Sequence, residues 1–498
     1  MTDAEFSPDA DQDDAAPIYT PPGEVPVAAE ATPEPKPQET PPPSTAPTGP
    51  QTLWFEQALL ADGWAKAVRF TITDGMISRI DTDVARRSDE TAHGPCLPGL
   101  PNLHSHAFQR AMAGLTETRG PTGDSFWTWR ELMYRFVDRL GPDEVQAIAA
   151  LAYMEMLETG STRVGEFHYL HHDRDGTPYT PAHAMELALA QAAASVGIRL
   201  VLLDTLYLTG GIDQPLSPAQ ARFSDGTVQR WLGRWHALRT ELAGHDRVSL
   251  GVALHSVRAV PVDAMRTVLT EIPADVPVHV HLSEQPQENN DSLRHYGTTP
   301  AGLLESIDGL RPQVGVVHAT HLTDADIARI GAARASAVFC PSTEADLGDG
   351  IGPALELSRA GAPIALGSDQ NAVIDPFLEM RGLEAGERLR SGRRGRFSPA
   401  DLLAAATANG YAALGLGAHG LRPGDPCDLV EVAPDTVRTV GSLPAQLLLT
   451  ATAADVRRVI VAGRVVAQNG RLADGTDPAA LLGHALTRVQ QRLEEDRA

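Results

Sequence analysis

Histidines and carboxylates at the ends of apolar runs are the residues of this sequence best suited to chemistry. His104 and His106 lie two positions apart, and residues i and i+2 of a strand point to the same side, so both imidazoles can bind one cation. In HVHLSEQ (279–285), His279 and His281 also share a strand face, so spacing alone does not choose between them as a third ligand. His281 lies nearer the strand end, and we favour it. The pattern predicts a metal site.

Two carboxylates accompany these histidines. Glu284 lies three residues beyond His281, where it can contact a metal-bound water and move its proton. In GSDQN (367–371), Asp369 follows the apolar run PIALG and can serve both as metal ligand and as proton acceptor. The structural alternative for Asp369 is an N-cap of the next helix.

Lysine usage bears on the number of metal ions. The chain has two lysines, Lys36 and Lys66, and none between residues 98 and 420. Some hydrolases that bind two metals bridge them with a carboxylated lysine, and the sequence excludes such a centre. We therefore expect one metal ion per chain. Histidines with a carboxylate suit zinc, while iron and manganese stay open.

The elements that would hold these residues form an α/β pattern. Eight apolar runs alternate with mostly amphipathic segments such as 143–160, which is helical in its spacing and ends at Gly160. This predicts a (β/α)8 barrel of the TIM type, whose catalytic groups lie at the C-terminal strand ends. The runs are 99–108, 162–170, 197–208, 248–257, 276–284, 314–322, 336–343 and 363–371. Their ends carry His104, His106, His168, Tyr169, His255, His281, Glu284, His318 and Asp369.

The two ends of the chain predict a second, smaller domain. Apolar and polar residues alternate in 67–83 around an Asp74-Gly75 turn, and a similar strand-like pattern occurs at 425–433 and 456–470. We expect these pieces to pair as a small β-sandwich, so that the barrel is an insertion. The expected organisation is a disordered Pro/Ala/acidic tail (1–51), an N-terminal sandwich segment (52–97), the barrel (98–420), a C-terminal sandwich segment (421–475) and a closing helix (476–498).

Composition limits the class of protein. The net charge of −23 argues against nucleic acid and anionic membranes as partners. There is no signal peptide pattern and no apolar run of ~18 residues that would span a membrane. Three distant cysteines, Cys96, Cys340 and Cys427, suggest neither disulfides nor a cysteine-based zinc site. A cytoplasmic enzyme is expected.

Several motifs together resemble the amidohydrolase superfamily and, more closely, the formimidoylglutamate deiminase family. These motifs are PGLPNLHSHAFQRAMAGLTE (98–117), DSFWTWRELMY (124–134), HVHLSEQ (279–285), HATH (318–321) and GSDQN (367–371). The resemblance covers about 52–470 and implies a distorted barrel, a flanking β-sandwich, and one zinc ion per chain. It also implies hydrolytic deamination of N-formimidoyl-L-glutamate to N-formyl-L-glutamate and ammonia, in histidine degradation.

The resemblance assigns roles residue by residue. It implies His104, His106, His281 and Asp369 as zinc ligands and Glu284, His318 and Asp369 as catalytic residues. It implies substrate contacts by Gln109, Arg130, Tyr169, His255 and Arg258. One departure is Asp346 in TEADLGDG (343–350), where asparagine is expected, and this leaves the role of that loop open.

Two other functions are weighed against this one. One is a mononuclear deaminase of a heterocyclic base such as guanine, cytosine or adenosine, and the other is a non-catalytic barrel scaffold. A dicarboxylate needs arginines, because guanidinium groups bind carboxylates in bidentate fashion, so Arg130 and Arg258 favour the small dicarboxylate. No metal ligand is missing, which disfavours a scaffold. A homodimer is an option that the sequence leaves open.

Overall fold

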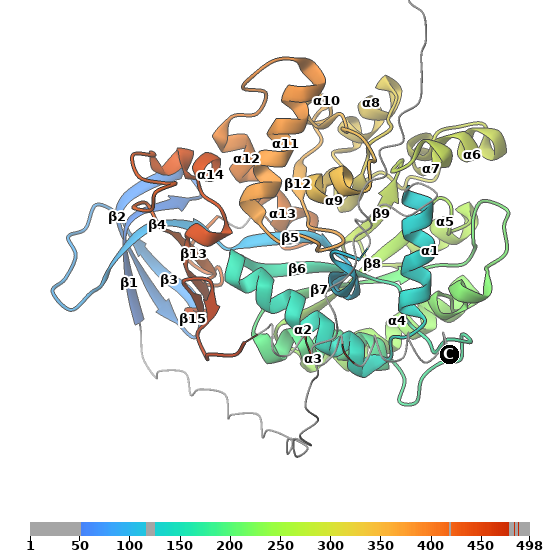
Figure 1. Cartoon of the computed structure of the whole chain (residues 1–498), viewed down its shortest axis with the longest axis horizontal. Coiled ribbons are helices and arrows are strands. Elements are labelled where there is room, and N and C mark those ends of the chain that lie inside the picture. Colours follow the sequence, from blue (N-terminus) through green and yellow to red (C-terminus); the bar gives the residue numbers. More distant parts are fainter. Residues whose placement is uncertain (1–50, 116–124, 418–419, 478–482, 484–486, 488–498) are drawn as a thin grey trace, which may run out of the picture. The chain divides into compact units, whose positions relative to one another are not determined.

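The computed structural model describes residues 51–115, 125–417, 420–477, 483 and 487 (Figure 1). The predicted disordered tail (1–51) and C-terminal helix (476–498) lie almost entirely outside the described residues. The described residues belong to one compact unit. The domain boundaries expected from the sequence stay a prediction.

A parallel barrel of eight strands confirms the predicted (β/α)8 fold. The strands run in chain order, each paired in parallel with the next, and most are buried along their whole length. Burial on both faces accounts for their near-continuous apolar sequences. The strands are β5 Leu100–Ser105, β6 Ser161–His168, β7 Arg199–Leu206, β8 Val248–Ser256, β9 Val278–Leu282, β10 Val314–His318, β11 Ser336–Phe339 and β12 Ile364–Leu366.

The barrel closes where the chain leaves β12 and meets β5. The backbone N–H groups of Ser368 and Asp369 donate to the carbonyl of His104 at 3.1 and 2.8 Å, and His106 donates to the carbonyl of Asp369 at 2.9 Å. Gly367 permits this approach, because a Cβ there would lie 2.8 Å from the backbone nitrogen of His104. Closure therefore brings two predicted ligand motifs together.

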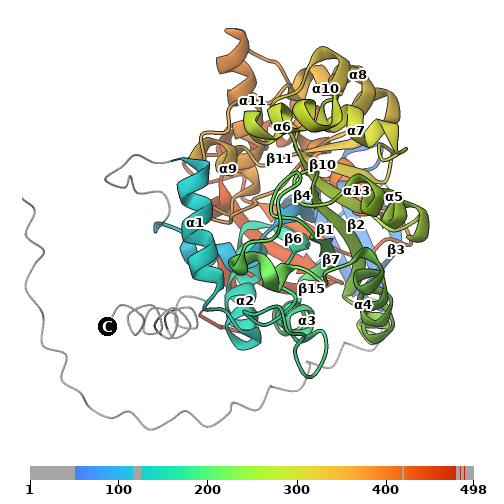
Figure 2. The same ribbon diagram turned by 90° about the vertical axis from the view of Figure 1, so that its right-hand side faces the viewer.

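Helices surround the barrel strands (Figure 2). The predicted helix at 143–160 is α2, Pro142–Thr159, which ends at Gly160 with a φ of 107°. The other main helices are α1 Phe126–Val137, α3 Ala184–Val196, α4 Val228–Glu241, α5 Val262–Glu271, α6 Pro286–Tyr296, α7 Pro300–Ser306, α8 Asp324–Ala333, α9 Pro341–Asp346, α10 Ala354–Ala360, α11 Pro376–Ser391, α12 Pro399–Ala405 and α13 Ala408–Ala413. Among the described residues, none of the helices combines the length and hydropathy needed to cross a bilayer.

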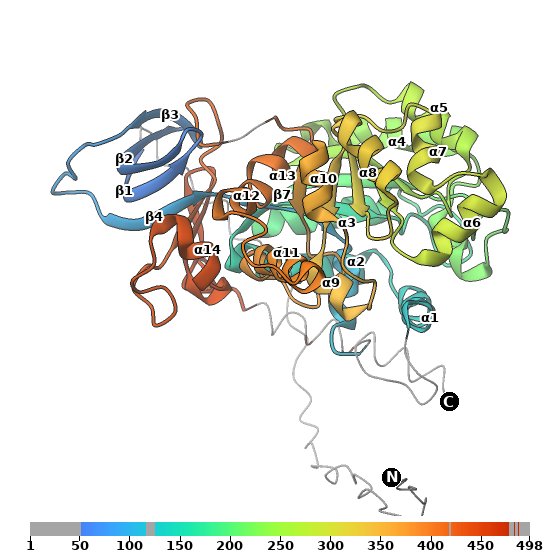
Figure 3. The same cartoon turned by 90° about the horizontal axis from the view of Figure 1, so that it is seen from above.

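A second eight-stranded sheet is built from both ends of the chain. Its order is β16-β15-β14-β13-β4-β1-β2-β3, and Figure 3 shows β1–β4 grouped near α14, Leu447–Thr450. The predicted hairpin is β2–β3, with positive φ values of 51° at Asp74 and 76° at Gly75. The strands are β1 Gln51–Leu60, β2 Gly63–Thr73, β3 Met76–Asp81, β4 Ala92–Pro98, β13 Leu429–Val432, β14 Val456–Val461, β15 Arg464–Gln468 and β16 Arg471–Leu472.

An ion pair joins this sheet to the barrel. The Arg199 guanidinium, at the start of β7, donates to both carboxylate oxygens of Asp428 at 2.7 and 3.3 Å. Asp428 directly precedes β13 and also accepts the backbone N–H of Ala462 at 2.8 Å. The pair therefore connects elements far apart in the sequence.

Candidate metal and substrate site

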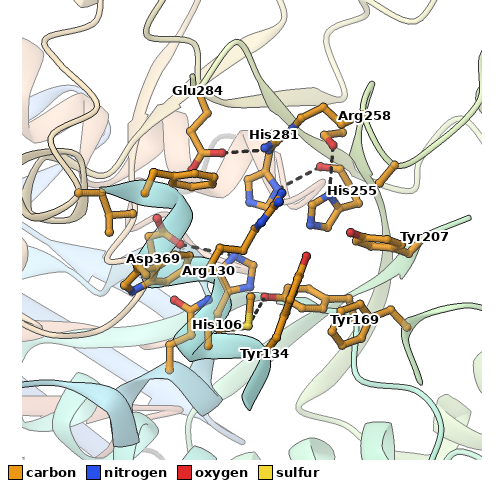
Figure 4. A pocket seen from close by; sticks show the side chains of 18 of the residues that line it. His106, Arg130, Tyr134, Tyr169, Tyr207, His255, Arg258, His281, Glu284 and Asp369 are labelled. Atoms are coloured by element: carbon orange, nitrogen blue, oxygen red, sulfur yellow. Dashed lines mark hydrogen bonds and ion pairs between the residues drawn. The ribbon is translucent and has the colours of Figure 1, made fainter. Parts of the chain in front are cut away.

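A pocket of about 650 Å³ opens at the C-terminal ends of the barrel strands. Figure 4 shows labelled side chains that point into it from α1 and from several strand ends. It brings together nearly every residue predicted from the sequence. Of these, His106, Gln109, Arg130, Tyr169, His255, Arg258, His281, Glu284, His318 and Asp369 line it, with His104 buried behind His106 and His281.

Three imidazoles and one carboxylate converge on a single point. The Nε2 atoms of His104 and His281 are 3.1 Å apart. The Asp369 Oδ1 lies 3.4 Å from the His104 Nε2 and 3.5 Å from the His106 Nε2. The ligand atoms of His104, His106 and His281 lie within 4.8 Å of one another. The four residues form a compact set of donors for one cation.

The outer ring nitrogens of two of these histidines face backbone carbonyls. The His106 Nδ1 is 2.8 Å from the carbonyl oxygen of Phe167, and the His281 Nδ1 is 3.0 Å from that of His255. Each Nδ1 must therefore carry the hydrogen, which leaves the Nε2 lone pair directed at the convergence point. The His104 Nε2 lies 3.1 Å from that of His281, and with its hydrogen on Nδ1 His104 would direct a further lone pair to the same point, an arrangement that fits a bound metal ion.

Burial keeps the imidazoles in the form that binds metal. Burial, together with the neighbouring His104, lowers the pKa of His106 to about 3. Burial also lowers the pKa values of His104 and His281 well below the usual range. These rings are neutral at pH 7, and a neutral imidazole is a metal ligand.

His318 lies among three carboxylates beside the cluster. Its Nε2 is 3.7 Å from Glu284 and 3.8 Å from Asp369, and its Nδ1 is 3.5 Å from Glu344. Burial alone would lower the pKa of His318, but the attraction of Glu284 and the other carboxylates outweighs it and raises the pKa to about 10. His318 and these three carboxylates can therefore hold and orient a charged ligand group at the floor of the pocket.

The two predicted arginines occupy different environments. Arg258 donates to Glu284 at 3.0 Å, and its Nε lies 3.3 Å from the Oε2 of the buried Glu288. Arg130, on α1, lies over the Trp127 ring at 4.5 Å from its centroid. Arg258 is thus fixed by acids, whereas Arg130 is supported by an aromatic face.

The remaining predicted substrate residues form one wall of the pocket. The His255 Nδ1 lies 3.1 Å from the Ser256 hydroxyl, and the Tyr169 ring packs edge-on against His255 with centroids 5.5 Å apart. The Gln109 side chain is 3% exposed, and its Oε1 has no hydrogen-bond partner among the described residues. Gln109 therefore offers an unused polar atom at the pocket.

Two histidines of the motifs lie away from this pocket. His168 ends β6 as expected, but its side chain lies in a separate buried group with His171 and Glu186. His279 is fully buried, and its Nε2 is 3.1 Å from the carbonyl oxygen of Ala413. Neither residue is in the convergent cluster, whereas His281 is.

Several site residues are not marked by the sequence. Glu344 and Glu288 are buried acids on helices, where their spacing resembles that of surface residues. Tyr134, the last residue of the motif at 124–134, and Tyr207 also line the pocket, but the sequence assigned neither of them a role. Asp346, the suspected departure, is exposed and accepts a hydrogen bond from the Gln370 side chain at 3.1 Å. No local pattern marks Glu288, Glu344 or Tyr207 as a site residue.

Comparisons with known proteins identify the family. Residues 96–466 match the amidohydrolase family, and residues 52–94 match the N-terminal domain of formimidoylglutamate deiminase HutF. A formimidoylglutamate deiminase of Pseudomonas aeruginosa is 42% identical over 434 residues, or 84% of this chain and 95% of the relative. An 8-oxoguanine deaminase of the same organism is 32% identical over 400 residues, or 78% of this chain and 85% of the relative.

Solved structures agree with this result. The crystal structure of an amidohydrolase from Brucella melitensis superposes with a TM-score of 0.84 at 36% identity, covering 88% of this chain and 100% of that one. An adenosine deaminase from Xanthomonas campestris with bound zinc shares the fold, with a TM-score of 0.75 at 23% identity and coverage of 89% and 98%. The chain therefore belongs to the amidohydrolase family, as a hydrolase of carbon–nitrogen bonds close to the formimidoylglutamate deiminases.

Proposed function

We propose that the protein hydrolyses N-formimidoyl-L-glutamate to N-formyl-L-glutamate and ammonia in histidine degradation, with one zinc ion per chain. The observation that carries this proposal is a single pocket that has a histidine–carboxylate cluster at its floor and two arginines among its lining residues. The similarity to the formimidoylglutamate deiminase of Pseudomonas aeruginosa supports the same substrate.

His104, His106, His281 and Asp369 would hold the metal. A bound zinc ion lowers the pKa of its water from ~15.7 towards ~7 and so supplies a nucleophile at neutral pH. The neutral, carbonyl-oriented imidazoles described above support this assignment. Zinc is preferred on the donor set, which combines imidazoles with one carboxylate.

Protons move between the carboxylates of this chain. Asp369 accepts a proton from the water that adds to the formimidoyl carbon. Glu284 shuttles the protons released by the water and then by the hydroxyl of the adduct to the departing nitrogen, because ammonia leaves far more readily than an amide ion. The carbon–nitrogen bond breaks, and the formyl group remains on the glutamate. His318, close to both carboxylates, donates a hydrogen bond that stabilises charge developing on the oxygen.

The glutamyl moiety carries two carboxylates, and we assign them to the polar walls. Arg258 and Arg130 supply guanidinium groups, with Gln109, Tyr169 and His255 as further polar contacts. The small-molecule dicarboxylate is the proposed partner. Because Arg258 also donates to Glu284, binding of a carboxylate at Arg258 would change the environment of the proton donor.

A heterocycle deaminase is the second candidate. It is favoured by the 32% identical 8-oxoguanine deaminase and by the rings of Phe126, Trp129 and Tyr207, which line the pocket and could stack on a base. A neutral base leaves Arg130 without an anionic partner among the described residues, so this candidate ranks second.

Ammonia release tests the two candidates. Purified enzyme is offered N-formimidoyl-L-glutamate, 8-oxoguanine, guanine, cytosine and adenosine in parallel. We expect turnover of the first substrate alone. Efficient turnover of a base, with none of formimidoylglutamate, would reverse the assignment.

Arginine substitutions test the carboxylate contacts. Arg258→Met and Arg130→Met should each lower kcat/KM for formimidoylglutamate by roughly 10–150-fold, because a hydrogen bond to a charged group contributes about 1.5–3 kcal/mol. Arg266→Met on α5, an exposed arginine paired with Asp263, is the matched control and should change nothing. Wild-type rates in both Arg258→Met and Arg130→Met would show that these arginines do not bind the substrate carboxylates.

A further inference from the structure

Two phenols, those of Tyr134 and Tyr207, lie in the pocket with the arginines. We propose that Tyr134 and Tyr207 are additional carboxylate-binding residues and that Gln220 is the positioning residue that orients their hydroxyl groups. This proposal rests on the proposed function, since it assigns the phenols to the same dicarboxylate substrate. Figure 4 shows Tyr134 and Tyr207 on the side of the pocket that also holds Tyr169 and His255.

Gln220 has a fixed orientation. Its Oε1 accepts the backbone N–H of Ser217 at 2.8 Å, so its amide nitrogen must face the opposite way. That nitrogen donates to the Tyr207 hydroxyl at 2.8 Å and to the Tyr134 hydroxyl at 3.2 Å. Gln220 is 3% exposed and belongs to a short helical segment, Pro218–Phe223. Both hydrogens of its amide are thereby used.

This geometry decides where the hydroxyl hydrogens point. Each phenol oxygen already accepts a hydrogen from Gln220, so each hydroxyl must donate elsewhere. If one phenol donates to the other, the second still has a hydrogen to donate. Among the described residues, no carboxylate, carbonyl or other acceptor outside the pair is hydrogen-bonded to either phenol. At least one O–H therefore remains to donate to a ligand in the pocket.

The surroundings favour an anionic ligand. The Tyr134 ring lies 5.8 Å from the Arg130 guanidinium, and the Tyr207 ring packs edge-on against His255 with centroids 4.5 Å apart. Phe223 packs against both rings, with centroid distances of 5.9 and 5.4 Å. The phenols are thus donors placed beside the residues proposed to bind carboxylates.

Tyr207 remains a proton donor at all ordinary pH values. Burial raises its pKa well above the usual value, and the nearby Tyr134 raises it further. A neutral phenol donates to a carboxylate, whereas a phenolate would repel one. The nearby cationic Arg258 does not overcome the effect of burial.

Three substitutions separate donation from packing. Tyr207→Phe and Tyr134→Phe each remove one hydroxyl but keep the ring. Gln220→Glu keeps the shape and can still accept the Ser217 N–H, but its carboxylate would draw the phenol hydrogens away from the pocket. Tyr296→Phe on α6, a partly buried tyrosine outside the pocket, is the matched control.

Calorimetric binding of the expected product, N-formyl-L-glutamate, to metal-loaded protein is the first measurement. Both tyrosine variants should raise Kd by about tenfold or more, and Gln220→Glu should raise it further. In turnover, KM for formimidoylglutamate should rise in parallel while kcat changes less than about threefold. Metal content and Tyr296→Phe should match the wild type.

The same titration with two amide analogues identifies carboxylate recognition. N-formyl-L-glutamine and the α-amide of N-formyl-L-glutamate each lack one negative charge. The tyrosine variants should lose less affinity for the analogue that lacks the carboxylate they bind. Equal losses for the diacid and for both amides would mean that the hydroxyl groups do not bind a carboxylate, and unchanged Kd values in both variants would also overturn the proposal.

Failure of this proposal and failure of the proposed function look different. Wild-type turnover of formimidoylglutamate with unchanged KM in all three variants overturns the role of the phenols alone. A wild type that binds N-formyl-L-glutamate through the phenols but does not hydrolyse formimidoylglutamate overturns the proposed reaction alone. A wild type that neither binds nor turns over these compounds overturns both.

Discussion

At the scale of single residues, the tautomers of the histidines carry the case for a metal. The carbonyls of Phe167 and His255 fix the hydrogen of His106 and His281 on Nδ1, so their Nε2 atoms can only accept. The His281 Nε2 nevertheless lies 3.1 Å from that of His104. Without a metal ion, His104 can meet the His281 lone pair only with a hydrogen on its own Nε2, whereas a bound cation would use the lone pairs of all three rings.

Metal analysis tests this interpretation. We expect about one equivalent of zinc per chain, and we expect His104→Ala or His281→Ala to abolish both metal and turnover because each removes a ligand at the convergence point. Elemental analysis after gentle purification measures the metal, and His236→Ala, at an exposed position on α4, should retain it. Two tightly held equivalents that are both required for activity would contradict the single site.

Glu284 should be needed for the rate and not for the metal. It contacts Arg258 at 3.0 Å and lies 3.7 Å from His318, but it is outside the proposed ligand set. Glu284→Gln should therefore keep the zinc and lower kcat by about 10²–10⁴-fold, the usual contribution of a general acid–base group. Steady-state kinetics on metal-assayed protein measure this, with the exposed Glu271→Gln as control. Near-normal turnover would remove Glu284 from the mechanism.

At the scale of elements, barrel closure and ligand geometry depend on the same contact. The segment after β12 donates from Ser368 and Asp369 to the carbonyl of His104, so strand pairing itself sets the position of Asp369 against the histidines. Asp369 has a φ of 48°, a left-handed conformation that is uncommon for a non-glycine residue and that this closure maintains. A disturbance at this seam should affect stability and metal binding together.

Gly367→Ala tests this coupling. The new Cβ would lie 2.8–2.9 Å from backbone and side-chain atoms of His104, so the seam must open. Overpacking of this kind typically costs about 1–3 kcal/mol, and we expect a lower Tm together with weaker zinc retention. Gly233→Ala on α4 meets nothing within 4 Å and should instead stabilise the helix slightly. A normal zinc content in a destabilised Gly367→Ala protein would separate the two properties.

At the scale of the whole molecule, the barrel is held to the sheet that the two chain ends build. Asp428 is 4% exposed and receives both the Arg199 guanidinium and the N–H of Ala462. The backbone carbonyl of Asp428 also accepts the N–H of Gly99 at 2.9 Å, directly before β5. This residue therefore links the barrel to both chain segments that build the small sheet.

Asp428→Asn should lower stability without changing the chemistry. Breaking one side of a buried ion pair leaves the other charge uncompensated, and we expect the free energy of unfolding to fall by about 3 kcal/mol. Urea denaturation measures this loss, while kcat/KM should stay at the wild-type value because the pair lies outside the pocket. Asp263→Asn, in an exposed pair with Arg266, should leave the unfolding free energy unchanged. An equal effect of the two substitutions would show that the buried link adds nothing.

Local geometry allowed the sequence by itself to determine the barrel and the proposed metal cluster. The alternation that places His104 and His106 on one face, and the strand-end position of His281, depend on neighbouring residues in the chain. The parallel order of strands then brings such ends to one rim, whatever the details of packing. Glycines in the sequence likewise predicted where α2 ends, at Gly160, and where the β2–β3 turn lies, at Gly75.

Only the tertiary structure decided which side chains meet across elements. Glu288 reaches Arg258, and Gln220 reaches Tyr134 and Tyr207, from segments whose sequences look like ordinary helical turns. These contacts depend on strand register, on loop paths and on the direction in which each side chain points. His168 illustrates the last factor, because it ends its strand and yet its side chain lies in a buried group outside the pocket. Periodicity describes a residue's own element, but a contact between elements exists only after the barrel has closed and its helices have packed.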